Sequence, residues 1–178
     1  MTTRNTLTCA CGQFHVEVTG KPFITAECHC RSCREAARRL ASVPIARAMT
    51  SASGGVPYVL YRKDMVGFPD GTDSLAEFRL SETSPTRRVL TTCCSTPVFT
   101  EFSGGHWVSL FASLWPEDKR PPMQIRTQTG DVDEGTTLDA SLPAGAMTTA
   151  GFYAKLLAAW IAMGFKVPKI AVTRKFAA

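Results

Sequence analysis

Several features that would assign the chain to a common functional class are missing from its sequence. No apolar run approaches the roughly 20 residues that cross a bilayer, so we expect no membrane span. The first residues contain no apolar core of the kind that an export signal needs, which predicts a cytoplasmic protein. No phosphate-binding glycine loop, paired-carboxylate signature or Gly-x-Ser-x-Gly elbow occurs. These absences argue against membrane transport, secretion and the commonest nucleotide-binding and serine-hydrolase classes.

A strong excess of one charge is missing as well. The formal net charge is only +5, and the basic residues are scattered without interleaved aromatic residues. The sequence therefore argues against nucleic-acid binding, whereas a mildly positive chain suits an anionic small molecule. The composition, with 44% hydrophobic and 20% charged residues, is typical of a globular protein. The length favours one domain that spans residues 1–178.

Short runs of β-branched and aromatic residues, separated by turn residues, dominate the chain. Polar and apolar residues alternate over 13–19, as in a half-buried strand. The pair Gly104-Gly105 separates two such runs and predicts a hairpin. Evenly spaced short strands predict a mainly β, antiparallel domain. The expected strands cover 13–19, 22–26, 56–60, 75–80, 87–91, 97–102, 106–111 and 124–127.

Two helices are expected among these strands. Ser32 and Glu35 match a capping box, with Ser32 as the N-cap of a short helix that extends to Leu40. The second helix is amphipathic, covers about 148–164 and ends at Gly164. We expect it to pack on the sheet through an apolar stripe with helical spacing, formed by Phe152, Tyr153, Leu156, Leu157, Trp160 and Ile161.

The strongest signal is the grouping of the seven cysteines. An odd number without an export signal favours metal ligands over a disulfide framework. Zinc prefers thiolates in a tetrahedral arrangement, and closely spaced cysteines supply two ligands with little loss of chain entropy. Seven buried, inert cysteines are the alternative, which clusters at ligand spacing disfavour. The three groups are Cys9 with Cys11, then Cys28 with Cys30 and Cys33, and finally Cys93 with Cys94.

The spacing divides these cysteines into two expected zinc sites. Cys28, Cys30 and Cys33, called the middle cluster below, offer three thiols within six residues. Three protein ligands leave a position open for water or substrate, as in catalytic zinc sites. A structural site needs further ligands for Cys9 and Cys11, and only the late pair remains to supply them. His29 lies between two ligands and is expected to point away from them, because neighbouring side chains in an extended segment alternate.

The order of these motifs resembles that of the glutathione-dependent formaldehyde-activating enzyme family. The resemblance rests on Cys-x-Cys-Gly, on Cys-His-Cys-x-x-Cys-Arg and on a late cysteine motif that ends at Pro97. It covers roughly residues 7–130, including Arg88. It implies a β-tent fold, one structural zinc, and a catalytic zinc on the middle cluster. The implied activity joins glutathione and formaldehyde into S-hydroxymethylglutathione, which is the chemistry of a carbon–sulfur lyase.

The late motif departs from the pattern Cys-x-x-Cys-Gly that the resemblance implies. With Pro97 as the anchor, Cys94 matches the second cysteine, Thr91 stands in place of the first, and Ser95 replaces the glycine. Cys93 is then a substitute ligand. Because adjacent side chains of an extended segment point to opposite faces, both cysteines would reach one metal only with strain. We therefore expect a structural site that holds three thiolates, is weak or is empty.

The arginines that follow the middle cluster are candidates for substrate binding. Arg31, Arg34 and Arg38 recur at helical spacing and could hold the carboxylates of a glutathione-like thiol. A solvated helix face is the alternative. Arg34 is the preferred candidate because it directly follows a ligand.

The sequence thus supports two functional interpretations. The first is a zinc-dependent carbon–sulfur lyase-like enzyme that joins or releases a small aldehyde and a thiol. The second is a zinc-stabilised binding or scaffolding module without catalysis. A fourth protein ligand at the middle cluster would favour the second interpretation.

Overall fold

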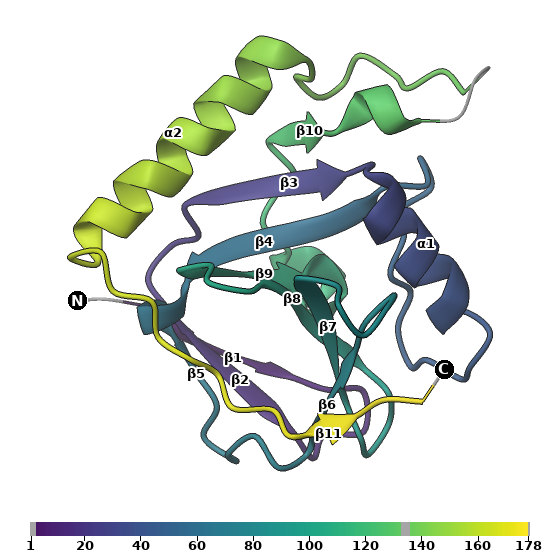
Figure 1. The fold of residues 1–178 in the computed structure, drawn as a ribbon, viewed down its shortest axis with the longest axis vertical. Coiled ribbons are helices and arrows are strands. Elements are labelled where there is room, and N and C mark those ends of the chain that lie inside the picture. Colours follow the sequence, from purple (N-terminus) through teal and green to yellow (C-terminus); the bar gives the residue numbers. More distant parts are fainter. Residues whose placement is uncertain (1–2, 133–135, 178) are drawn as a thin grey trace.

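Two β-sheets form the body of the protein in a computed structural model that describes residues 3–132 and 136–177 (Figure 1). The small sheet has the order β1-β2-β5, and the large sheet has the order β10-β3-β4-β9-β8-β7-β6-β11. The small sheet contains β1 (Arg4–Thr8), β2 (His15–Thr19) and β5 (Val66–Gly67). The large sheet contains β3 (Ile24–Cys28), β4 (Val56–Arg62), β6 (Leu75–Phe78), β7 (Thr86–Thr91), β8 (Pro97–Phe102), β9 (Trp107–Phe111), β10 (Ile125–Thr127) and β11 (Arg174–Lys175).

The mainly β class that the sequence predicts is confirmed, but the pairing is mixed. The expected strand 97–102 has the bounds of β8, and it forms a hairpin with β9 across Gly104 and Gly105. The purely antiparallel arrangement is wrong, because β10 pairs in parallel with β3 and β11 pairs in parallel with β6. A long stretch of chain separates each of these strands from its partner. Such a connection can bring two strands together in parallel, whereas a tight hairpin cannot.

The apolar residues form two cores, and each cysteine group lies beside a different one. The first core lies between the small sheet and the large sheet and buries Phe14, Val16, Phe99 and Leu110. The second core lies beneath helix α1 (Arg31–Leu40). Cys9 belongs to the first core and Cys33 to the second. The fold therefore places the two cysteine groups in separate packing environments.

Helix α1 begins earlier than the predicted capping box would place it. Cys30 is the N-cap, and its sulfur accepts a hydrogen bond from the backbone N–H of Cys33 at 3.3 Å. Ser32 already lies inside the helix, so the predicted N-cap is wrong. Glu35 instead binds Arg38 and Arg39 on the exposed face. The extended backbone that delivers Cys28 and Cys30 turns at Cys30, and this turn sets the start of the helix.

Helix α2 (Ala146–Ala162) lies across the end of the large sheet near β10 and β3 (Figure 1). It begins two residues before the predicted start, and Gly164 follows it with a positive φ of 61°. Leu156 and Ala159 are buried. Tyr153, Leu157 and Ile161 are more than half exposed. The apolar stripe of α2 is thus wider than the face of the helix that packs against the rest of the protein.

No helix of the described chain is long and apolar enough to cross a membrane.

Candidate metal centres and the adjoining cavity

Four cysteine sulfurs from two distant turns meet at one point of the surface. Cys9, Cys11, Cys93 and Cys94 form this four-cysteine cluster, with all sulfurs within 4.8 Å of one another. The Cys11–Cys93 sulfur distance is 3.3 Å, and the Cys9–Cys93 distance is 3.8 Å. Sulfurs about 2.3 Å from a tetrahedral metal lie about 3.8 Å apart. The cluster therefore has the donor atoms and the spacing of a closed four-ligand metal site.

The sulfurs of both late cysteines lie in this cluster, although strand geometry predicted that their side chains point to opposite faces. Cys93 and Cys94 lie in a turn between β7 and β8, where side chains do not alternate as in a strand. Ser95 has a φ of 51°, which explains why a glycine would suit this position. The Ser95 N–H donates to the Thr91 carbonyl and closes the turn. Thr91, which stands in place of a cysteine, contacts the Cys94 sulfur through its hydroxyl at 3.4 Å.

The hydroxyls beside Cys94 favour its thiolate. Burial opposes ionisation, but hydrogen bonds from Thr91 and Thr96 outweigh it and lower the pKa of Cys94 to about 5. The Thr96 hydroxyl also accepts a hydrogen bond from the backbone N–H of Ala10. The same threonine thus contacts both turns of the four-cysteine cluster.

The middle cluster lies where β3 runs into α1. The sulfurs of Cys28, Cys30 and Cys33 lie within 4.8 Å of one another. Cys33 is buried, whereas Cys28 and Cys30 are partly exposed. Hydrogen bonds from the Cys28 and Cys30 thiols and the charge of Arg88 lower the pKa of Cys33. Within the described chain, no further cysteine, histidine, aspartate or glutamate joins this group.

A buried cation lies beside the middle cluster. Arg88 on β7 is 1% exposed, and its Nη2 donates to the hydroxyl and the carbonyl of Ser32 in the first turn of α1. Among the described residues, its Nε and Nη1 atoms have no hydrogen-bond partner. A buried guanidinium without an anionic partner is costly. Three thiolates around a divalent cation carry a net charge of −1, so an occupied middle cluster would compensate Arg88.

The donor sets therefore fit metal binding at both places. Thiolates of this number and spacing match zinc, which accepts four sulfur ligands in structural sites and three protein ligands where a position stays open. All seven cysteines are free of disulfide bonds. The structure brings together every cysteine that the sequence singled out, and it separates them into the two expected groups.

A cavity of about 390 Å³ opens onto the middle cluster. Tyr58 on β4 is one of its lining residues, and its hydroxyl is 3.6 Å from the Cys33 sulfur and 2.9 Å from the Thr100 hydroxyl. Burial raises the pKa of Tyr58 well above its usual value, so the hydroxyl keeps its proton. Sequence reasoning missed Tyr58, because only the pairing of β4 with β3 and β9 brings it near the cysteines.

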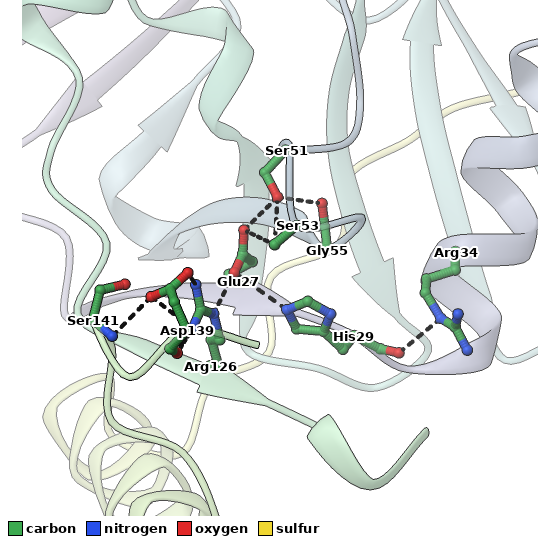
Figure 2. Close-up of polar contacts among 9 residues, drawn as sticks. All are labelled: Glu27, His29, Arg34, Ser51, Ser53, Gly55, Arg126, Asp139 and Ser141. Carbon is green, nitrogen blue, oxygen red and sulfur yellow. Dashed lines mark hydrogen bonds and ion pairs between the residues drawn. The ribbon is translucent and has the colours of Figure 1, made fainter. Parts of the chain in front are cut away.

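A polar network lies on the opposite side of β3 from the middle cluster. Figure 2 shows Glu27 at its centre, between Arg126 on the left and His29 on the right, with Ser51 and Ser53 above it. His29 is 1% exposed and donates through Nε2 to Glu27 at 3.2 Å, while Arg126 donates to the same carboxylate at 2.8 Å. His29 thus points away from the cysteines as expected, into a buried network.

This network is tightly packed and strongly favours an ionised Glu27. Burial opposes ionisation, but hydrogen bonds, led by those from Ser51 and Arg126, lower the pKa of Glu27 to about 2. A Cβ atom on Gly55 would lie 2.6 Å from Glu27 and 2.7 Å from His29, so only glycine fits there. Asp139 holds the far end of Arg126 at 3.0 Å. The network therefore fixes the backbone on both sides of Cys28.

The three candidate arginines do not surround the cavity. Arg34 donates through Nε to the His29 carbonyl at 3.2 Å and through Nη2 to the Asp131 carbonyl. Arg38 is paired with Glu35, at 2.8 Å. Arg31 is exposed. The cation that interacts with the middle cluster is Arg88 instead.

These features define a mainly β protein in which two cysteine clusters could each hold a metal ion, one of them at the mouth of a cavity. The chain belongs to the glutathione-dependent formaldehyde-activating enzyme family, which matches residues 4–129. This membership suggests chemistry on formaldehyde and thiols. No curated protein matches the chain.

The structure is also similar to the crystal structure of a protein from Rhodobacter sphaeroides that was a structural genomics target. The sequence identity is 13% and the TM-score is 0.45, over 79% of this chain and 100% of that one.

Proposed function

We propose that the protein is a zinc-dependent carbon–sulfur lyase-like enzyme that joins or releases a small aldehyde and a thiol such as glutathione. The observation that carries the proposal is the middle cluster, which presents three sulfurs to a cavity and has no fourth protein ligand among the described residues. In the joining direction the thiol sulfur forms a bond to the carbonyl carbon. The proton of the thiol ends on the carbonyl oxygen, so the reaction needs no oxidant or reductant.

The two clusters take different roles in this proposal. Cys9, Cys11, Cys93 and Cys94 would hold a structural zinc, whereas Cys28, Cys30 and Cys33 would hold the catalytic one. When bound at the middle cluster, zinc supplies a positive charge that stabilises a thiolate and polarises a carbonyl group. Arg88 compensates the excess negative charge of the three thiolates from the protein side.

Tyr58 is positioned to act on the carbonyl partner. Tyr58 lines the cavity, and its hydroxyl lies 3.6 Å from the Cys33 sulfur and is held by Thr100. We assign to Tyr58 the donation of a hydrogen bond to the carbonyl oxygen, where negative charge develops as the carbon–sulfur bond forms. Such a donor is worth about a hundredfold in rate in comparable sites.

The interpretation as a binding or scaffolding module would require a closed middle site. A fourth protein ligand would close it, and His29, the nearest histidine in sequence, is instead bound to Glu27. The open cluster therefore favours catalysis.

The proposal is tested by following aldehyde consumption by zinc-replete protein with glutathione and with mercaptoethanol. Cys30→Ser should abolish turnover and release one zinc per chain. Tyr58→Phe should keep both metal ions and lower kcat about a hundredfold. If the protein does not accelerate aldehyde consumption above the rate in buffer with either thiol, the proposed enzyme activity is wrong. The interpretation as a binding module would then be preferred.

The role predicted for Arg34 has its own kinetic signature. If its guanidinium holds a substrate carboxylate, Arg34→Ala should raise KM for glutathione more than it lowers kcat, as expected for the loss of uniform binding. KM for mercaptoethanol should not change. An equal effect on both thiols would instead indicate that the variant disturbs the bonds of Arg34 to the loop at Asp131.

A further inference from the structure

The walls of the cavity at the middle cluster are mainly apolar. Ala26 from β3 and Leu60 from β4 line the cavity together with the three cysteines. The hairpin of β8 and β9 contributes Phe102 and Trp107. Helix α2 contributes Thr149, Phe152, Tyr153 and Leu156. The other lining residues are polar but uncharged: Tyr58, Thr100, Ser109, Thr127 and Gln128. The space next to the sulfurs is therefore bounded mainly by aromatic and aliphatic groups.

Helix α2, which supplies one wall, lies outside the family match. The match ends at residue 129, and α2 begins at Ala146. The helix is fixed in place by His106, whose Nε2 donates to the Leu156 carbonyl at 2.8 Å. Trp160 stacks on the same imidazole, with the ring centroids 5.5 Å apart. The wall is thus a firmly attached addition to the part of the chain that defines the family.

Apart from the three cysteine sulfurs, no charged side chain lines this cavity in the part of the chain that the structure describes. None of the described lining residues is an arginine, lysine, aspartate, glutamate or histidine. Glutathione carries two carboxylates and an ammonium group, and burying such groups without partners is strongly unfavourable. An uncharged apolar body would instead gain free energy by removing its own surface and that of Phe152 and Trp107 from water.

We infer that the thiol partner of this protein carries an uncharged, apolar or aromatic body of a size that fits the cavity, and that α2 provides this preference. The inference rests on the proposed function, because it names the substrate class for the same site. Tyr58 and Thr100, whose hydroxyls are in contact, also line the cavity and remain available to the reacting oxygen.

Binding of unreactive analogues tests the preference without turnover. Benzyl methyl sulfide and S-methylglutathione both lack the S–H group, so neither can form the adduct. We expect calorimetry on zinc-replete full-length protein to show binding of benzyl methyl sulfide at least about tenfold tighter than that of S-methylglutathione. Equal or reversed affinities would overturn the inference. Tighter binding of benzyl alcohol, an analogue of the aldehyde partner, than of the sulfide would also overturn it, because the apolar body would then belong to the aldehyde.

Variants of α2 locate the preference on the helix. Phe152→Ala should weaken benzyl methyl sulfide about tenfold, because one aromatic wall of the cavity is lost. Tyr153→Ala, at a side chain that is 57% exposed, should weaken it less while leaving the fold intact. Leu157→Ala is the matched control, since this side chain is 53% exposed and does not line the cavity. Unchanged affinity in both cavity variants would overturn the assignment to α2.

Kinetics separate a failure of this inference from a failure of the proposed function. If the inference holds, kcat/KM with formaldehyde should be higher for benzyl mercaptan than for glutathione. Turnover that is faster with glutathione, together with weak sulfide binding, would keep the proposed function and overturn the inference. Tight sulfide binding without turnover of any thiol would support the apolar preference and remove the proposed reaction.

Discussion

The four-cysteine cluster and the middle cluster use the same donor atom in opposite surroundings. The first joins two turns that are more than 80 residues apart in sequence, and Cys11 and Cys93 are exposed to solvent. The middle cluster falls within six residues and lies beside a cavity, a buried arginine and a tyrosine hydroxyl. A metal that closes a long loop contributes mainly to folding, because it removes chain entropy from the unfolded state. A metal bound by cysteines that are close in sequence closes only a short loop. It therefore removes little chain entropy from the unfolded state, and its role can be chemical instead.

The largest expected effect separates the clusters by stability. Cys11→Ser should lower the free energy of unfolding by several kcal/mol, since metal-binding energy at this cluster is partly folding energy. Cys30→Ser, the same replacement in the middle cluster, should cost much less. Urea unfolding with a zinc count measures both, and Ala10→Ser serves as the control. A Cys11→Ser protein that keeps its metal and unfolds with the parent would contradict the structural role.

The next effect concerns the two adjacent cysteines. Because both sulfurs lie within reach of one metal, Cys93→Ala and Cys94→Ala should each reduce the zinc bound at the four-cysteine cluster. The measurement is zinc per chain after dialysis against a weak chelator. Loss in Cys94→Ala alone would show that Cys94, which matches the second cysteine of the motif, is the ligand and that Cys93 is not.

A smaller effect tests the charge beside the middle cluster. Arg88→Met removes the buried cation, and we expect this cluster to release zinc to a chelator about tenfold more readily. Arg88→Lys, which keeps the charge, should recover part of the affinity. The four-cysteine cluster should retain its metal in both variants. Equal loss from both clusters would show that Arg88 acts on the fold as a whole.

The smallest effect concerns helix α2, which lines the cavity at the middle cluster and is held by His106. Burial lowers the pKa of His106 below its usual 6.5, although the bond to the Leu156 carbonyl opposes the shift. The folded protein therefore binds this proton less readily than the unfolded chain does. Its contribution to stability is present above pH 6.5 and is lost as the pH falls through the folded pKa.

His106→Gln tests this contribution because glutamine can still donate to the carbonyl but does not titrate. The drop in free energy of unfolding between pH 7 and pH 5 should be smaller in the variant, by no more than about 1 kcal/mol. Urea unfolding monitored by tryptophan fluorescence at both pH values measures it. An identical drop in both proteins would exclude His106 as the titrating group.

Local sequence patterns identified the elements that depend on local physics. The run 97–102, rich in β-branched and aromatic residues, predicted β8, and the cysteine spacing identified both clusters. The predicted capping box is wrong because the chain already turns at Cys30, so that α1 begins before Ser32. Two-residue strands such as β5 and β11 carry no periodic signal, and their pairing depends on the completed sheet.

The surroundings of the middle cluster could not be predicted, because they come together only through tertiary contacts. Tyr58, Arg88 and Phe152 come from β4, β7 and α2, three elements with no shared motif. The alternation rule gave a correct direction for His29, where the chain is extended, and a wrong one for Cys93, where it turns. The rule that neighbouring side chains alternate therefore holds only where the backbone is extended, and it does not hold in a turn.

The short strands β10 and β11 form the two edges of the large sheet. They occupy its two ends, with three and two paired residues respectively. Arg174 and Lys175 on β11 are exposed, and charged, short edge strands discourage the addition of a further strand. Removing β11 would uncover β6, a longer edge with Leu75 and Phe78 among its residues. A protein shortened in this way should fail by self-association through its sheet edge before it fails by unfolding.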